Sequence, residues 1–279
     1  MARTFLAFQH DAQLHTLEST VLAVYPFPSL DEASRQLFKD GTDKHHAVVM
    51  DKTIFHPQGG GQPSDTGRIL RSNNNNNNND NNDNNNGDGS MFTVTAVRMD
   101  ANGQVLHLGL FAAADVFDKG EAVQQVIDVE SRLLYSRLHT AGHVLGSAVR
   151  HLLESQIKNF DELKASHFPD SASCEFQGSI EAKWKEPIQK QLDEYIAAKM
   201  PVQVEWWSED DFRAKGLERL IPDRSLVPPG EKARVVHIVG AEVYPCGGTH
   251  VDFTDQCGSV SVRKIARKAG NSRVSYAVS

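Results

Sequence analysis

The feature that most constrains this chain is a long apolar run at helical spacing, from Glu130 to Glu154. Its apolar residues recur every three or four positions, as they do along the buried face of a helix. They are Leu133, Leu134, Leu138, Ala141, Val144, Leu145, Ala148 and Leu152. The run predicts a helix of about six or seven turns. It is the strongest secondary-structure signal in the chain.

The same run carries His139 and His143, four residues apart. Side chains at that spacing lie on one helix face about one turn apart, so both imidazoles can reach one metal ion. Far downstream, Cys246 and His250 repeat the spacing around two glycines, which form a flexible turn. Three imidazoles and one thiolate suit zinc. The sequence therefore predicts one Zn²⁺ per chain, and the other histidines are predicted to be ordinary surface or core residues.

Such a zinc ion can have more than one role. The helix pair lacks the glutamate of the metalloprotease motif H-E-x-x-H, because Thr140 stands in its place. A peptidase is therefore not expected. A site with four protein ligands can be purely structural, since catalytic zinc usually keeps one position open. The residues by themselves leave the structural and the catalytic roles open.

The residues before the long helix predict a mostly β domain at 1–125, and we expect a small barrel there. A short helix at Leu30–Phe38, a strand at Ala47–Met50 and a hairpin of 91–97 with 104–108 are its clearest elements. The consecutive glycines Gly59, Gly60 and Gly61 permit positive φ angles and close backbone approach. The asparagine-rich stretch at 73–90 has nothing to bury and predicts a disordered insertion.

The residues from 126 to 279 predict a second domain of the α+β class, built around the long helix. The further elements expected in it are a strand at 173–180, a helix at 184–200, a strand at 202–206, a short helix at 208–217, a strand at 234–239 and a closing pair of strands at 258–265 and 273–278. Pro187 is expected in the first turn of its helix, where proline is tolerated. Ser208 is expected to cap the short helix.

Composition places the chain among soluble globular proteins, with 39% hydrophobic and 23% charged residues. No apolar run approaches the roughly 20 residues that a membrane span needs, and the N-terminus predicts no secretory signal. Three cysteines are too few for a disulfide framework. We therefore expect a reducing, cytoplasmic location, where metal binding is a common use of a thiolate.

Several segments together resemble a known family. HTAGHVLG (139–146), CGGTHV (246–251) and GSVSVRKIARKAGNSRVSYAV (258–278) resemble the editing domain of alanyl-tRNA synthetases, and most of all the freestanding alanyl-tRNA editing proteins of the AlaX type. FHPQGGGQPSDTG (55–67) resembles the glycine-rich motif of the longer AlaX forms. The resemblance covers nearly the whole chain apart from the asparagine-rich insertion. No segment resembles an aminoacylation core.

The resemblance implies a barrel-like domain followed by a zinc-containing editing domain of the threonyl/alanyl-tRNA synthetase type. It implies a zinc-dependent hydrolase that acts in trans on mischarged tRNA(Ala), chiefly Ser-tRNA(Ala) and also Gly-tRNA(Ala), without a nucleotide cofactor. The zinc ligands that it implies are His139, His143, Cys246 and His250, and the pocket residues are Gln62, Thr140, Gly59, Gly60 and Gly61. Two alternatives stay open: a non-catalytic tRNA-binding module with structural zinc, and a deacylase of another mischarged tRNA.

Charge is distributed unevenly along the chain. The net charge of −7 argues against indiscriminate binding to polyanions, but a local basic patch is enough to bind nucleic acid. No acidic residue follows Asp255, whereas several basic residues do. They are Arg263, Lys264, Arg267, Lys268 and Arg273. By itself this cluster predicts a solvated strand face, and with the family resemblance it becomes a candidate for contact with the tRNA backbone.

Overall fold

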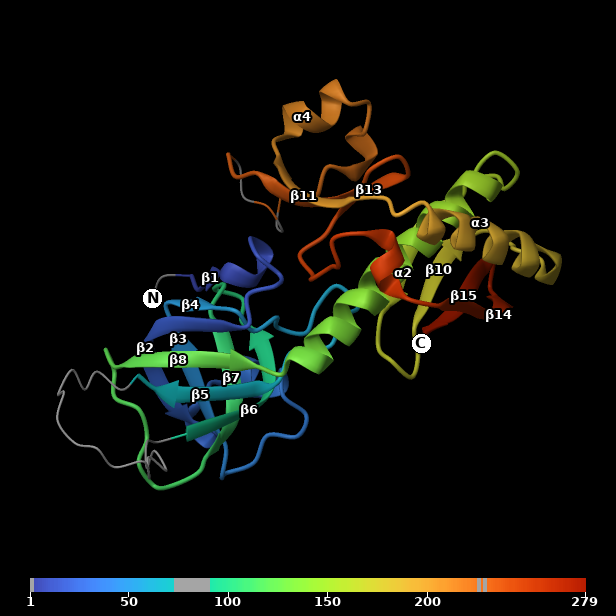
Figure 1. Ribbon diagram of the computed structural model, residues 1–279. Helices are drawn as coiled ribbons and strands as arrows, with labels where there is room; N and C mark the ends of the chain where they lie inside the picture. Colours follow the sequence, from blue (N-terminus) through green and yellow to red (C-terminus); the bar gives the residue numbers. More distant parts are fainter. Residues whose placement is uncertain (1–2, 73–90, 225–226, 228–229) are drawn as a thin grey trace, which may run out of the picture. The chain divides into compact units, whose positions relative to one another are not determined.

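The computed structural model describes residues 3–72, 91–224, 227 and 230–279, and the chain forms two compact units (Figure 1). The barrel unit comprises Met1–Gly59 and Pro63–Arg132. The second unit comprises Gly60–Gln62 and Leu133–Ser279. Three residues of the glycine-rich segment therefore belong to the second unit. The disordered insertion that we predict at 73–90 lies outside the described residues.

Six strands within the described residues close the barrel, in the order β2-β3-β7-β6-β5-β8. They are β2 (Thr16–Pro26), β3 (His46–Met50), β5 (Gly67–Arg71), β6 (Met91–Met99), β7 (Val105–Phe111) and β8 (Ala122–Ile127). The long strand β2 closes the ring, because its first half pairs with β8 and its second half pairs with β3. The expected N-terminal barrel is confirmed, and the predicted hairpin is the pair β6–β7.

Short elements surround the barrel strands. They are β1 (Phe5–Leu6), η1 (Ala7–Gln9), η2 (Phe27–Ser29), α1 (Glu32–Gln36) and β4 (Lys52–Thr53). The helix α1 lies within the predicted range, and the Asp31 carboxylate caps it by accepting from the Ser34 N–H at 2.9 Å. Apolar side chains such as Val48, Phe92 and Val94 fill a buried core in this unit. Strand alternation, which the sequence shows locally, is what points these side chains inward.

The second unit combines helices with two sheets, whose strand orders are β14-β15-β10-β9 and β11-β12-β13. Its elements are α2 (Val129–Leu153), β9 (Asp161–Ser166), β10 (Ser173–Gln177), η3 (Ala182–Trp184), α3 (Lys185–Ala197), β11 (Val202–Trp207), α4 (Glu209–Ala214), η4 (Glu218–Leu220), β12 (Ala233–Ile238), β13 (Glu242–Pro245), η5 (Thr254–Cys257), β14 (Val260–Lys268) and β15 (Asn271–Val278). The expected mixture of helix and strand is confirmed. No helix of the described ranges is long and apolar enough to cross a membrane.

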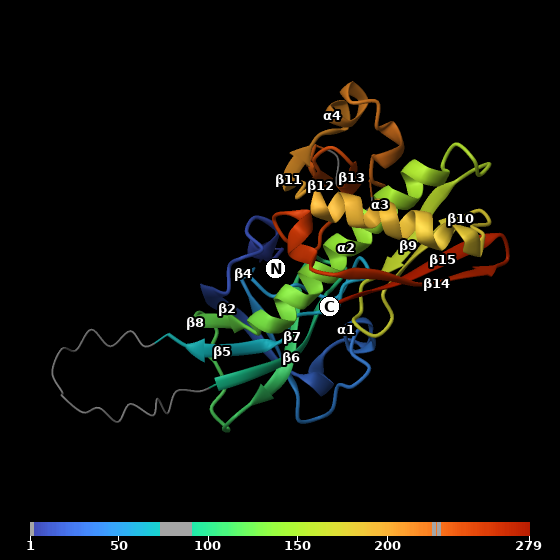
Figure 2. The same cartoon turned by 45° about the vertical axis from the view of Figure 1, so that its right-hand side comes forward.

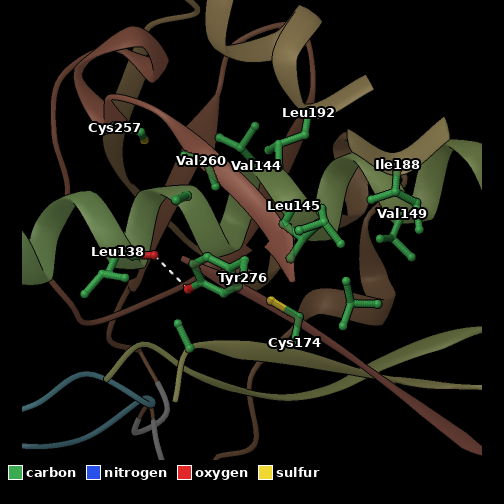
Figure 3. Close-up of a cluster of buried hydrophobic side chains, with 14 of the residues drawn as sticks. Leu138, Val144, Leu145, Val149, Cys174, Ile188, Leu192, Cys257, Val260 and Tyr276 are labelled. Carbon is green, nitrogen blue, oxygen red and sulfur yellow. Dashed lines mark hydrogen bonds between the residues drawn. The ribbon is translucent and has the colours of Figure 1, made fainter. Parts of the chain in front are cut away.

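Helix α2 covers the range that the apolar periodicity predicts. Its buried face packs with α3 and the larger sheet in one hydrophobic core (Figure 3). Val144 and Leu145 of α2, Leu192 of α3 and Val260 of β14 are all buried there. Figure 2 shows α3 beside the hairpin of β14 and β15. Gln189 of α3 ties the two together, since its amide nitrogen donates to the Val260 carbonyl at 2.9 Å.

The first turn of α2 carries a charge that is buried in the barrel unit. Arg132 is among the largest fully buried side chains, and its guanidinium pairs with the equally buried Asp65. It also donates to the carbonyls of Ala12, at 3.0 Å, and Ile54. A charge at this depth is tolerated only when a countercharge and hydrogen-bond acceptors surround it. Asp65, from the end of the glycine-rich segment, therefore anchors the start of α2.

This ion pair gives a test of barrel stability. Asp65→Asn leaves the Arg132 charge buried without a countercharge, and we expect it to lower the free energy of unfolding by about 3–5 kcal/mol. Urea denaturation followed by circular dichroism measures the change. The control is Glu209→Gln, which removes the carboxylate of the half-exposed pair Arg213–Glu209 and is expected to cost about 1 kcal/mol or less. Equal losses in the two variants would contradict the anchoring role of Asp65.

Candidate metal centre

Four nitrogen and sulfur donors meet at the middle of α2. His139 and His143 lie one helical turn apart on α2 and are both buried, with 1% and 9% of their surface exposed. Cys246 and His250 lie in the turn between β13 and η5. One donor atom from each of the four side chains lies within 4.8 Å of the other three. The two sequence pairs therefore form one group that can hold a metal ion.

The spacing of the donors fits tetrahedral coordination. The Cys246 Sγ lies 3.4 Å from the His139 Nε2 and 3.3 Å from the His250 Nε2. Metal–sulfur and metal–nitrogen bonds of about 2.3 and 2.0 Å give a nitrogen–sulfur edge of roughly 3.5 Å in a tetrahedron. The His143 Nδ1 is buried and has no hydrogen-bond partner within the described part of the chain. A metal ion at the centre of the group suits these donors better than hydrogen bonds between them.

Burial determines the charge of these side chains. Burial lowers the pKa of His143 well below its usual value, and the nearby His167 and Arg234 lower it further, because a second positive charge beside them is unfavourable. The His143 imidazole is therefore neutral and offers a lone pair. Burial also raises the pKa of the Cys246 thiol, although the Gly248 N–H and Arg234 oppose this effect. Because metal ions bind the thiolate, metal binding to this group is expected to release a proton.

Gln62 contacts the His139 ring at Nδ1, the nitrogen that faces away from Cys246. Its amide oxygen accepts from the Thr249 N–H at 3.0 Å, and its amide nitrogen donates to the Thr249 hydroxyl at 2.8 Å. The same oxygen lies 2.7 Å from the His139 Nδ1. An oxygen can only accept, so it keeps the proton of His139 on Nδ1 and leaves Nε2 free to face Cys246. Gln62 is fully buried, so it contacts the ligand rather than solvent.

Thr140 plays the equivalent part for His250. Its hydroxyl oxygen lies 3.1 Å from the His250 Nδ1 and accepts from the Val251 N–H at 3.2 Å. Thr140 is fully buried, like Gln62. Hydrogen bonds to the second nitrogen of a ligand imidazole set its tautomer and ring orientation, and they commonly contribute strongly to metal affinity. The two predicted pocket residues with side chains therefore contact two predicted metal ligands.

The glycines bring backbone close to this group. Gly60 and Gly61 have φ angles of +55° and +80°, which residues with a side chain rarely adopt. A Cβ on Gly61 would lie 2.4 Å from the Ala165 carbonyl oxygen, and a Cβ on Gly248 would lie 2.3 Å from the His139 ring. Gly59 belongs to the barrel unit, and a Cβ there would make only an ordinary contact, at 3.9 Å from the Pro57 carbonyl oxygen. Close approach therefore explains Gly61 and Gly248 but not Gly59.

The turn that carries Cys246 is held by a buried arginine. Arg234 of β12 donates from its guanidinium to the Cys246 carbonyl, and its own carbonyl accepts from the Cys246 N–H at 3.2 Å. Tyr244 packs its ring 4.3 Å from the His143 ring and donates to the His143 carbonyl at 3.2 Å. Sequence reasoning missed both residues. The position of Tyr244, two residues before Cys246, was the available signal for that residue, and Arg234, 12 positions away, had none.

A further histidine lies against the ligands. The His167 ring stacks on the His139 ring, with centroids 4.1 Å apart and planes inclined by 23°. Burial lowers the pKa of His167 to about 4, so it is neutral at physiological pH. The sequence places it among the ordinary histidines, because it follows β9 without a partner at a metal-ligand spacing. The structure adds it to the surroundings of the metal centre.

The predicted basic cluster lies on the hairpin of β14 and β15, within the second unit. Its members are Arg263, Lys264, Arg267 and Lys268 on β14 and Arg273 on β15. All five are exposed. Among the described residues, none of the five forms an ion pair with a carboxylate. Their positive charge is therefore available to a partner.

Comparison with known proteins points to one family. Residues 233–275, which include Cys246 and His250, match the model of the threonyl and alanyl tRNA synthetase second additional domain. The alanyl-tRNA editing protein AlaX-M of Methanosarcina barkeri is 29% identical over 231 residues, which are 82% of this chain and 87% of that protein. Over most of its length, this chain is similar to an alanyl-tRNA editing protein. The resemblance that the motifs predict is confirmed.

Alanine–tRNA ligases are also relatives of the chain. That of Methanosphaera stadtmanae is 27% identical over 99% of this chain, and that of Halobacterium salinarum is 30% identical over 86%. The chain spans only 27% and 23% of the length of these two ligases. The similarity to AlaX-M, in contrast, extends along most of both proteins, since it covers 82% of this chain and 87% of AlaX-M.

The metal centre can be tested by removing its sulfur. Cys246→Ala takes away the donor that lies between two imidazoles, and we expect metal affinity to fall at least about a hundredfold, because three imidazoles remain without the thiolate. Elemental analysis after dialysis against a weak chelator measures the bound metal. Cys257→Ala, which changes a buried cysteine of the hydrophobic core, serves as the control. Undiminished metal content in Cys246→Ala would show that the ligand set is wrong.

Proposed function

We propose that this protein is a trans-editing hydrolase that cleaves the ester between a wrongly attached amino acid and tRNA(Ala). The observation that carries the proposal is a buried group of three histidines and one cysteine, in a chain similar along 82% of its length to an alanyl-tRNA editing protein. The substrates are chiefly Ser-tRNA(Ala) and also Gly-tRNA(Ala). Hydrolysis in trans follows from the similarity to a freestanding editing protein.

The metal of the proposed site is one zinc ion per chain, held by His139, His143, Cys246 and His250. Three nitrogens and one sulfur at tetrahedral spacing suit zinc better than magnesium or calcium, which prefer oxygen ligands. When bound, zinc can polarise the ester carbonyl or hold a water molecule. The pocket residues Gln62 and Thr140 act by fixing the orientation of the imidazoles. Gly60 and Gly61 give Gln62 its place beside His139.

The need for a hydrolytic site follows from the chemistry of amino acid selection. A pocket that accepts alanine cannot strongly reject glycine, which lacks one methyl group, or serine, which adds one hydroxyl. A second site that removes the wrong product solves this problem. A separate editing protein supplies that second site to tRNA(Ala) after the wrong amino acid has been attached. This is the task that we propose for the chain.

The geometry favours one direction of approach for the aminoacyl end. The three imidazoles are buried, whereas Cys246 is half-buried and Gly247 is exposed. Of the ligand segments, the Cys-Gly-Gly turn is therefore the one nearest to solvent. The Arg234 hydrogen bond to the Cys246 carbonyl keeps this turn in place. The ester of the tRNA end is proposed to enter along the turn.

The exposed basic cluster of β14 and β15 is proposed to bind the tRNA backbone. Basic side chains bind phosphates largely without regard to sequence, and they position the nucleic acid for contacts elsewhere. This cluster belongs to the same unit as the metal centre. The net charge of −7 keeps the rest of the surface from competing for phosphates. Affinity for tRNA should therefore depend on a small set of lysines and arginines.

The proposed activity is tested by a panel of aminoacyl-tRNAs. We expect the purified protein to hydrolyse Ser-tRNA(Ala) and Gly-tRNA(Ala) and to hydrolyse Ala-tRNA(Ala) at least about a hundredfold more slowly, because editing sites discriminate by fit to the wrong amino acid. Release of radiolabelled amino acid measures the rates, with and without a zinc chelator. Binding of tRNA without hydrolysis would instead support a non-catalytic module, and hydrolysis of another mischarged tRNA alone would identify a different deacylase.

The tRNA-binding surface is tested by removing one charge. We expect Arg267→Ala to raise KM for Ser-tRNA(Ala) several-fold with little change in kcat, and to lower the slope of log affinity against log salt by about one. Filter binding at several salt concentrations measures the slope. The control is Lys190→Ala on α3, where the lysine is exposed and lies 3.9 Å from the Glu194 carboxylate. The same effect in both variants would argue against a specific role for the basic cluster.

A further inference from the structure

His167 takes part in a closed chain of contacts around one turn of α2. Its Nδ1 lies 2.7 Å from the Tyr276 hydroxyl, and that hydroxyl donates to the Leu138 carbonyl at 2.8 Å (Figure 3). Leu138 directly precedes His139, and the His139 ring stacks on His167. The chain of contacts therefore starts and ends at neighbouring residues of the same helix. It fixes His167 relative to the backbone that carries His139.

The donors in this chain follow from elementary chemistry. A carbonyl can only accept, so the Tyr276 O–H proton points to Leu138. The hydroxyl oxygen then accepts from the Nδ1–H of His167, which sets the tautomer of that ring. All the participating side chains are buried, with His167 1% and Tyr276 3% exposed. In such surroundings each hydrogen bond is costly to break, because water cannot replace the lost partner.

Space for the His167 ring is provided by a glycine within α2. A Cβ on Gly142 would lie 2.4 Å from the His167 Cε1 and 2.7 Å from the Tyr276 hydroxyl oxygen. Glycine is unfavourable inside a helix, and its presence one residue before His143 therefore has a packing reason. The backbone also holds His167, whose N–H donates to the Gly61 carbonyl at 2.8 Å. Two separate glycines thus place the ring against His139.

We propose that His167 and Tyr276 are a positioning pair that holds the His139 ring in the orientation required for metal binding. Gln62 fixes the edge of the same ring through Nδ1, and His167 fixes its face. Outer contacts that orient a ligand imidazole commonly change metal affinity by about ten- to a hundredfold. The inference rests on the proposed metal site and not on the proposed hydrolysis. It can therefore be tested without tRNA.

The test compares metal affinity in conservative variants. Tyr276→Phe removes only the hydroxyl, and His167→Ala removes the stacked ring. Each is expected to weaken zinc binding about ten- to a hundredfold in competition with a chromophoric chelator. Both residues act through one chain of contacts, so their effects should not add. The double variant is expected to lose no more zinc affinity than the single variant with the larger loss. Cobalt(II) substituted for zinc is expected to show shifted visible absorption bands, since the orientation of His139 changes.

A tyrosine of α3 that contacts a histidine of α2 offers a matched control. Tyr195→Phe removes a hydroxyl that lies 2.5 Å from the Nδ1 of His151, an exposed tyrosine–histidine contact near the end of α2. It is expected to leave zinc affinity and the cobalt spectrum unchanged. Circular dichroism establishes that each variant is folded. Unchanged affinity and spectrum in folded Tyr276→Phe, or failure of the parent protein to bind zinc, would overturn the proposal, whereas loss of hydrolysis alone would bear only on the proposed function.

Discussion

The second unit depends on the need of buried polar groups for partners. Helix α2 is buried along its middle, yet it carries His139, Thr140 and His143 there. Burying imidazoles and hydroxyls without partners costs several kcal/mol each, so every such group must be satisfied. Gln62 and His250 supply partners by hydrogen bonding. A metal ion is the natural partner for the nitrogens that face Cys246. The hydrophobic core of the unit packs around the helix that carries these polar groups.

The partners come from segments that are distant in sequence. Gln62 lies ahead of the barrel strands β5–β8, His167 follows β9, and Tyr276 lies in the last strand. Each reaches α2 because the larger sheet and the turn after β13 pack on that helix. Metal affinity and folding of the unit are therefore coupled, since a ligand that binds only the folded state stabilises it. An editing activity in this unit would depend on the same contacts.

Local patterns predicted most of the fold. Helical periodicity predicted a helix from Glu130 to Glu154, and α2 extends from Val129 to Leu153, because one turn of backbone is enough to place successive apolar residues on one face. The Ser208 cap of α4 was equally local. Strand β9 (Asp161–Ser166) had no such signal, since its residues are mostly polar and exposed. It is an edge strand whose place is set by pairing with β10.

The sequence by itself determined the two ligand pairs, because a spacing of four residues brings two side chains together on a helix or around a glycine turn. The tertiary structure brought the two pairs to one place, since His139 and Cys246 are 107 positions apart. Only the tertiary structure decided what surrounds them. Gln62 and His139 are 77 positions apart, and His167 and Tyr276 are 109 apart. Contacts at such separations leave no periodic trace in a single sequence, since they depend on how helices and sheets pack. The chemistry of the ligands is therefore local, and their orientation is a property of the whole unit.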